Sequence, residues 1–307
     1  MRTTFVETLL ELAASDPRIW LLTGDLGYSV LEPFAVAFPE RYLNAGVSEQ
    51  NMTGMAAGIA STGGIVFTYS IANFPVARAL EQIRNDICYP NLSVKIVAVG
   101  GGLAYGAQGY SHHAVEDLAF TRVLPNMTVV APGDPHEARA ATRALIATPG
   151  PAYLRLGKAG EPSVHGAAPD FALGRALCVR DGEDCTIMST GGVLTEAVRA
   201  RELLRNDGVD ACVLSMHTVQ PVDRDAISAA ARRGPIVTIE EHGEGGLAAA
   251  VGDALIDAGA PFRMKAIRLP RGPQSCAGSQ DWLRASAGVT SESVADAVRM
   301  LMTHTTC

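Results

Sequence analysis

The sequence contains no paired or clustered cysteines. None of its six cysteines belongs to a Cys-x-x-Cys pair or to a Cys/His cluster. They are Cys88, Cys178, Cys185, Cys212, Cys276 and Cys307. Isolated cysteines of this kind are typical of reduced proteins, and they argue against a structural zinc site. We therefore expect a reduced, cytoplasmic protein.

Long apolar stretches and an excess of basic charge are also missing. No apolar run approaches the roughly 20 residues that span a bilayer, and Glu7 and Glu11 interrupt the N-terminal segment where a signal peptide needs an apolar core. The net charge is −7 and the acidic residues are scattered, so neither a nucleic-acid footprint nor a patch for anionic membranes is visible. Small-molecule chemistry or a protein partner is expected instead.

Short apolar runs alternate with helical patterns, and this alternation predicts α/β domains with parallel sheets. The chain has 307 residues and 48% hydrophobic content, which is enough for two such domains. In the first half, the predicted strands are 19–25, 65–70, 94–101, 127–132 and 151–157, and the predicted helices include 49–62, 75–88 and 134–147. Asp134 and Pro135 suit the cap and first position of the last helix.

A segment rich in Gly, Pro and Ala then interrupts the alternation. Because it lacks a periodic apolar face, we interpret residues 158–172 as a linker between domains 1–160 and 173–307. In the second domain, the predicted strands are 185–190, 210–217, 235–242 and 262–270, and the predicted helices are 193–206, 224–232, 245–258 and 293–302.

Polar residues lie where several predicted strands of the first domain end. Ligands of parallel sheets bind beyond the carboxyl ends of strands, and Asp25, Glu49, the loop 100–113 and Arg155 fall in such positions. For Glu49, one reading is an acid that interacts with the helix macrodipole, worth about 0.3–1 kcal/mol. The other is a carboxyl with few polar neighbours, which could hold or share a proton at neutral pH.

The glycine-rich loop 100–113 ends in the pair His112 and His113. The loop matches neither the P-loop nor the dinucleotide fingerprint. Histidine serves in proton transfer, although one or both rings could equally pack or face solvent, and at most one is expected to face a site. Phe67, Tyr69 and Phe74 stand out in a chain with only 6% aromatic residues. They suit core packing or the stacking of a planar heterocycle.

In this order, the segments resemble the C-terminal half of transketolase, a thiamine diphosphate enzyme. "NAGVSEQNM" is similar to that family's Gly-Val-x-Glu-(His/Gln) element, and "GYSHHAVEDLAFTRVLPNMTVVAPGDPHEA" is similar to its Gly-x-Thr-His-x-x-x-Glu segment. "GPAYLRLGK" resembles its Pro-x-Tyr-x-Arg strand, and "GGLAAAVGDAL" resembles the glycine-led helix of its third domain. The resemblance covers essentially the whole chain. It implies a pyrimidine-binding domain followed by a transketolase C-terminal domain.

The resemblance implies the following cofactor contacts. Glu49 would hold a hydrogen bond to the aminopyrimidine ring and favour the imino tautomer that deprotonates the thiazolium carbon. Phe74 would stack on the pyrimidine, with Tyr69 nearby, and Asp25 would lie near the cofactor.

The resemblance also implies substrate contacts. His112 would contact the substrate oxygen and assist proton transfer, and Arg155 would bind the substrate phosphate through its fork of donors. Arg2 and Ser29 keep the spacing of two further phosphate contacts. Gln108 and His113 complete the substrate-binding candidates.

Two departures put the standard pentose-phosphate substrates in doubt. The family usually carries a sugar-reading aspartate at Gln108 and often a phosphate-contacting histidine at Gly100. A specialised ketose or aldose is therefore expected.

The chain also lacks the family's Gly-Asp-Gly…Asn element, whose oxygens bind Mg²⁺. The resemblance thus implies a separate N-terminal subunit that holds the diphosphate and Mg²⁺, in an α2β2 assembly.

Three readings compete at this point. The first is the pyrimidine-binding subunit of a split transketolase. The second is the β subunit of a 2-oxoacid dehydrogenase E1, or an enzyme like deoxyxylulose-phosphate synthase. The third is a non-catalytic subunit of transketolase descent.

Overall fold

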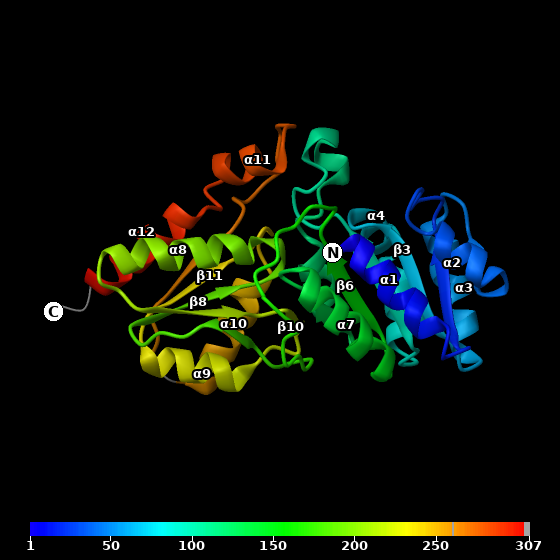
Figure 1. Ribbon diagram of the computed structural model, residues 1–307, viewed down its shortest axis with the longest axis horizontal. Helices are drawn as coiled ribbons and strands as arrows, with labels where there is room; N and C mark the ends of the chain where they lie inside the picture. Colours follow the sequence, from blue (N-terminus) through cyan, green and yellow to red (C-terminus); the bar gives the residue numbers. More distant parts are fainter. Residues whose placement is uncertain (260, 304–307) are drawn as a thin grey trace.

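The computed structural model describes residues 1–259 and 261–303, which form two α/β units side by side (Figure 1). The first sheet has seven strands in the order β10-β5-β6-β4-β3-β1-β2. Their bounds are β1 Ile19–Thr23, β2 Tyr42–Asn44, β3 Ile65–Ile71, β4 Val94–Val99, β5 Thr128–Val130, β6 Ala152–Leu156 and β10 Thr218–Gln220. All pairs are parallel except β10 with β5. The predicted fold class is confirmed.

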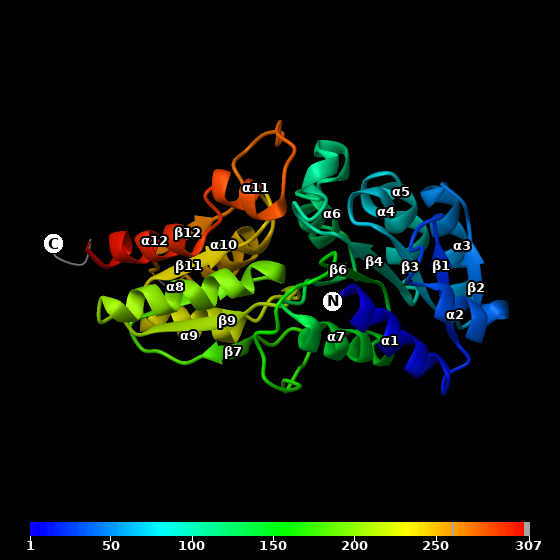
Figure 2. The same ribbon diagram turned by 45° about the horizontal axis from the view of Figure 1, so that its top comes forward.

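Helices cover both faces of this sheet (Figure 2). Those of the first unit are α1 Arg2–Ala13, α2 Glu32–Ala37, α3 Glu49–Ser61, α4 Asn73–Ala77, α5 Leu80–Gln82, α6 Asp117–Arg122 and α7 Pro135–Ala147. Helices α1 and α7 pack on one face, and α3 packs with residues 76–88 on the other. Every residue of β4 and β6 is therefore buried, as expected for parallel strands covered on both faces.

The helix predicted at 75–88 is not one regular helix. The structure has α4, then α5, and then a π-helical turn at Ile83–Cys88. Apolar periodicity cannot distinguish these neighbouring helical forms, and π-turns occur often at functional sites. The helix start at Asp134 is confirmed, because its side chain accepts a hydrogen bond from the Glu137 amide at 2.9 Å.

The second sheet has five strands in the order β12-β11-β8-β9-β7, and only β7 is antiparallel. Its strands are β7 Leu177–Arg180, β8 Cys185–Ser189, β9 Ala211–Ser215, β11 Ile236–Ile239 and β12 Met264–Ile267. Its helices are α8 Leu194–Asn206, α9 Arg224–Arg233, α10 Leu247–Ala258, α11 Gln280–Ser286 and α12 Ser291–Thr303. Helices α8 and α12 cover one face, while α9 and α10 cover the other.

The two units are joined by more than a linker. Strand β10 lies beyond the linker in the sequence, yet it pairs with β5 at the edge of the first sheet. Residues 157–176 contain no helix or strand. Within the described residues, no helix is long and apolar enough to cross a membrane.

Candidate active site

The candidate residues of the first domain gather at the carboxyl end of its sheet. Glu49 opens α3 shortly after β2, Phe74 lies in α4 after β3, and His112 lies in the loop after β4. Parallel strands present their carboxyl ends at one edge, so these three segments become neighbours. Asn73 connects two of them, because its side-chain amide donates to the Ser111 carbonyl at 3.0 Å.

Glu49 is a buried carboxyl with one charged partner. Its side chain is 5% exposed, and Oε1 accepts a hydrogen bond from Nη1 of Arg78 at 2.9 Å. Tertiary folding thus brings the Arg78 guanidinium to the carboxyl, a partner that lies 29 positions away in the sequence. A buried acid needs such a partner when it is ionised.

Arg78 and His112 also contact the ring of Phe74. The Arg78 Cζ atom lies 4.2 Å from the Phe74 ring centroid. The His112 ring meets Phe74 edge to face, with centroids 5.2 Å apart. Glu49, Arg78, Phe74 and His112 thus form one contiguous cluster. Arg78 is absent from the sequence predictions, although its spacing of four residues from Phe74 is the helical spacing that brings side chains together.

The two adjacent histidines point to different surroundings. His112 is partly exposed, and its Nδ1 lies 3.0 Å from the Ser111 hydroxyl. When that hydroxyl donates to Nδ1, the proton of the neutral ring sits on Nε2. His113 is 1% exposed, and its Nε2 lies 3.5 Å from the Gly106 carbonyl oxygen. Of the two, only His112 belongs to the cluster.

Two cations, Lys158 and Arg2, lie near Tyr105, whose ring neighbours that of His112. The Tyr105 ring centroid is 6.3 Å from that of His112, and the Lys158 ammonium lies 4.9 Å above the Tyr105 ring. Burial raises the pKa of Tyr105, and the nearby Arg2 charge opposes this shift. The Nε of Arg2 is buried and has no hydrogen-bond partner among the described residues. Tyr105 also fills the space beside Gly100, where a Cβ would clash with its ring.

The two remaining cofactor candidates make no contact with the Glu49 cluster within the part of the chain that the structure describes. Asp25 follows β1 with φ 59°, and its Oδ1 accepts from the Tyr28 hydroxyl at 2.7 Å and the Asn44 amide at 3.0 Å. These hydrogen bonds, Tyr28 first, lower the pKa of Asp25. Tyr69 is 3% exposed and stacks on Phe5 in the core, with centroids 6.4 Å apart. Tyr69 therefore packs on the α1 side of the sheet, whereas α3, which begins at Glu49, covers the other side.

The two other substrate candidates are exposed. Ser29 has φ 63°, and its amide donates to Glu32 Oε1 at 2.7 Å. Gln108 ends a short 3-10 turn, Gly106–Gln108.

Arg155 is the centre of a buried polar network rather than a free phosphate fork. Its Nε donates to Asp117 Oδ2 at 2.8 Å, and Nη2 donates to the carbonyl oxygens of Ala114 and Glu241 at 2.8 and 3.0 Å. The Tyr153 hydroxyl donates to the same Asp117 oxygen at 2.5 Å. Glu241 belongs to the second domain, so Arg155 ties the two domains together.

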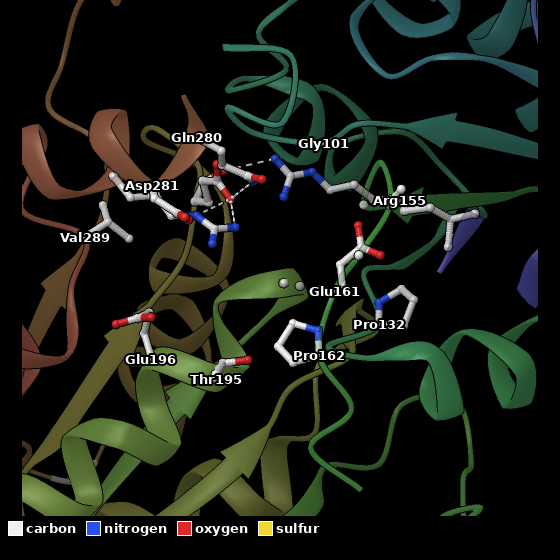
Figure 3. Close-up of a pocket in the computed structure, with 18 of the residues that line it drawn as sticks. Gly101, Pro132, Arg155, Glu161, Pro162, Thr195, Glu196, Gln280, Asp281 and Val289 are labelled. Atoms are coloured by element: carbon white, nitrogen blue, oxygen red, sulfur yellow. Dashed lines mark hydrogen bonds and ion pairs between the residues drawn. The ribbon is translucent and has the colours of Figure 1, made fainter. Parts of the chain in front are cut away.

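A polar cavity of about 600 Å³ lies between the domains (Figure 3). Arg155 lines it from the first domain, Glu161 from the segment between the domains, and Glu196, Gln280 and Arg284 from the second domain. Arg284 pairs with Glu241 at 2.5 Å, so charges of this wall already have partners within the protein. The Glu49 cluster is not part of the lining.

One cluster of metal-type donors lies away from this region. Cys178, Asp181 and Cys212 place one donor atom each within 4.8 Å of one another. Strand pairing of β7 with β9 brings the two cysteines together, which their wide spacing in the sequence hides. Cys307 lies outside the described residues.

Comparison with protein families assigns both domains. Residues 1–160 match the family "Transketolase, pyrimidine binding domain", and residues 174–294 match "Transketolase, C-terminal domain".

Three similar proteins cover almost the same span. The chain is 41% identical over 267 residues to a subunit of the apulose-4-phosphate transketolase of Phocaeicola vulgatus, with 86% of each chain covered. It is 36% identical over 300 residues to the 6-deoxy-6-sulfo-D-fructose transketolase subunit SqwH of Clostridium sp., with 96% of this chain and 92% of that one covered. A solved structure described as a split gene transketolase, inactive beta4 tetramer, superposes with a TM-score of 0.88 at 38% identity, and the match covers 98% of this chain and 97% of that one.

Proposed function

Because this chain belongs to the transketolase family, with that family's pyrimidine-binding and C-terminal domains, we propose that it is the pyrimidine-binding subunit of a split transketolase. The assembled enzyme transfers a two-carbon ketol unit from a ketose to an aldose, with thiamine diphosphate as cofactor. The observation that carries the proposal is the cluster in which Arg78 links a buried carboxyl, Glu49, to the ring of Phe74, which in turn contacts the imidazole of His112.

The residues of this cluster fit the pyrimidine end of thiamine diphosphate. Phe74 offers a ring on which a planar heterocycle stacks. Glu49, buried at the start of α3, offers a carboxyl to a ring nitrogen. When bound, the cofactor would supply the nucleophilic carbon that carries the two-carbon unit. Glu49 holds a proton or a hydrogen bond at the ring nitrogen, and the surrounding protein excludes water from that bond.

His112 is assigned to the substrate. With Ser111 at Nδ1, the opposite nitrogen is free to donate to a substrate oxygen and to move a proton there. Its contact with Phe74 sets the position of the ring next to the pyrimidine site.

Arg2 and Lys158 are assigned to an anionic end group of the substrate. Neither forms an ion pair with another of the described residues, so both cations are available to a phosphate or sulfonate. Ser29, Gln108 and His113 remain substrate-binding proposals, and Asp25 remains a cofactor proposal. Arg155 contributes at most Nη1, because Asp117 and two backbone carbonyls take its other donors. Its main role is to position the loop that ends at α6.

A partner subunit completes the proposal. No Gly-Asp-Gly…Asn element occurs in this sequence, so the diphosphate and Mg²⁺ are assigned to an N-terminal subunit in an α2β2 complex. Two similar proteins are named as subunits of transketolases, and a similar tetramer of β chains is described as inactive. Both facts support a chain that needs its partner.

The test is to co-express the chain with the product of its neighbouring gene and to measure two-carbon transfer from a panel of ketoses and ketose phosphates. Activity is expected only from the complex, and Glu49→Gln should lower it by at least about 100-fold, the range of a lost proton-transfer group. Equal activity of Glu49→Gln would favour a non-catalytic subunit. Carbon dioxide release from pyruvate would favour the second reading, a 2-oxoacid dehydrogenase E1 or an enzyme like deoxyxylulose-phosphate synthase. Tight binding of thiamine diphosphate and Mg²⁺ by this chain alone would exclude the split enzyme.

A further inference from the structure

Arg78 contacts both groups that would hold a planar ring at this site, the Glu49 carboxyl and the face of Phe74. Its Nη1 donates to Glu49 Oε1 at 2.9 Å, while its Cζ lies 4.2 Å from the centroid of Phe74. A single flat, cationic group therefore donates an N–H to the buried carboxyl and covers the aromatic face at the same time. An aminopyrimidine ring that bound here would need the same carboxyl and the same face.

We propose that the Arg78 guanidinium stands in for the cofactor's aminopyrimidine ring in the chain alone, and that the ring must displace it to bind. This inference rests on the proposed function, because it concerns the ring site of the same enzyme. It adds a residue that regulates access to the site.

The position of Arg78 would allow a ligand to displace its side chain easily from Glu49 and Phe74. Its side chain is 50% exposed, whereas that of Glu49 is 5% exposed. Arg78 also follows the last residue of the short helix α4, so its long side chain can rotate into solvent without any change in the core. The buried carboxyl cannot move in the same way.

Arg78 also explains how the site persists without a cofactor. A buried carboxylate that loses its only cation is strongly disfavoured, and Arg78 is the one ion-pair partner of Glu49 among the described residues. The guanidinium therefore gives the buried Glu49 carboxyl a hydrogen-bond donor and keeps Phe74 covered until a ring takes its place.

The competition should be measurable but modest. A half-exposed ion pair and an exposed cation–π contact are each weak, and together they would reduce the affinity of a competing ring by about 5- to 30-fold. Such a barrier is overcome when a partner subunit binds the diphosphate end of the same molecule.

The experiment uses the full chain and the aminopyrimidine half of thiamine as the probe, titrated by calorimetry and by NMR. Arg78→Ala should bind the probe at least about 5-fold more tightly than the unmodified chain. Arg84→Ala is the matched control, because Arg84 is an exposed arginine of the nearby π-helical turn Ile83–Cys88 that pairs with Asn85 rather than with Glu49. It should leave the affinity unchanged. Adding Phe74→Ala to Arg78→Ala should abolish the gain.

Methylguanidinium provides a second measurement. If a guanidinium occupies the ring site, free methylguanidinium should compete with the probe in Arg78→Ala and have no such effect in the unmodified chain. Equal affinities of Arg78→Ala and the unmodified chain would overturn the inference, as would a complete lack of binding in Arg78→Ala. Two-carbon transfer by the assembled enzyme would show that the proposed function stands even when this inference fails.

Discussion

Replacing Arg155 by methionine should destabilise the protein more than it weakens substrate binding. The Arg155 side chain is 6% exposed and that of Asp117 is 2% exposed, and the two are joined at 2.8 Å. Without the guanidinium, the Asp117 carboxylate stays buried with Tyr153 as its remaining side-chain donor. The carbonyls of Ala114 and Glu241 lose a donor as well. Removing one partner of a buried ion pair lowers the free energy of unfolding by about 3–5 kcal/mol.

Urea unfolding of the full chain measures this loss. For a slope of about 3 kcal/mol/M, the midpoint should fall by roughly 1–1.7 M. Arg143→Met is the control, because Arg143 pairs with Glu11 at 2.8 Å with side chains 45% and 55% exposed. Exposed pairs of this kind contribute about 0–1 kcal/mol. The double variant Arg155→Met, Asp117→Leu should recover part of the loss, because no unpaired charge then remains buried.

A loss below about 1 kcal/mol for Arg155→Met, equal to that of the exposed control, would refute the structural role. A complex in which that variant keeps its stability but raises the KM for a phosphorylated ketose would instead support the substrate-phosphate role. The two outcomes separate the role implied by the family resemblance from the one indicated by the contacts.

Two further predictions concern pH and the segment between the domains. Burial first of all lowers the pKa values of His217 and His242 to about 4 and raises that of Glu240 to about 7. Between pH 4.5 and 5.5 the unfolded chain therefore binds almost two more protons on the histidines and up to one fewer on the carboxyl, so these three groups should raise the free energy of unfolding by about 1 kcal/mol per pH unit. His217→Asn should flatten this slope in urea titrations, and a slope unchanged by the substitution would contradict the assignment. Asp134→Ala removes the cap of α7 and the acceptor of two amides in residues 164–165, so it should cost about 2–4 kcal/mol and speed proteolysis of that segment. Asp134→Asn keeps one acceptor oxygen in place of two, so it should retain the cap of α7 or the hydrogen bonds to residues 164–165 but not both, and lose less than Asp134→Ala. Equal losses for the two variants would contradict the capping argument.

Much of the fold could be predicted because it depends on local patterns. Strands such as β4 and β6 are continuous apolar runs, which parallel sheets require when helices cover both faces. The start of α7 was also predictable, since a cap uses only neighbouring atoms. The break after α4 was not, because α, π and interrupted helices bury the same apolar positions. The pairing of β10 with the first sheet could not be predicted either, because the residues of a strand do not specify which strand it pairs with.

Some features of the candidate site could likewise be predicted from the sequence, and others could not. The order of Glu49, His112 and Arg155 along the chain was enough to indicate the family and the end of the sheet at which we propose the active site. That order could not show that Arg78 pairs with Glu49, that Tyr69 turns into the core, or that Asp117 holds Arg155. Each is a contact between segments far apart in the sequence or a choice between two faces of a strand.

Residue type and spacing were sufficient to predict the alternation of strands and helices and a division into two domains, and to single out the candidate carboxyl and imidazole. These features depend on interactions over a few neighbouring positions, so they can be read along the chain. Which cation each buried acid meets, and which arginines stay available to a ligand, became visible only in three dimensions. Burial and pairing depend on distances through space. In this protein the tertiary fold brings together strand ends that are far apart along the chain.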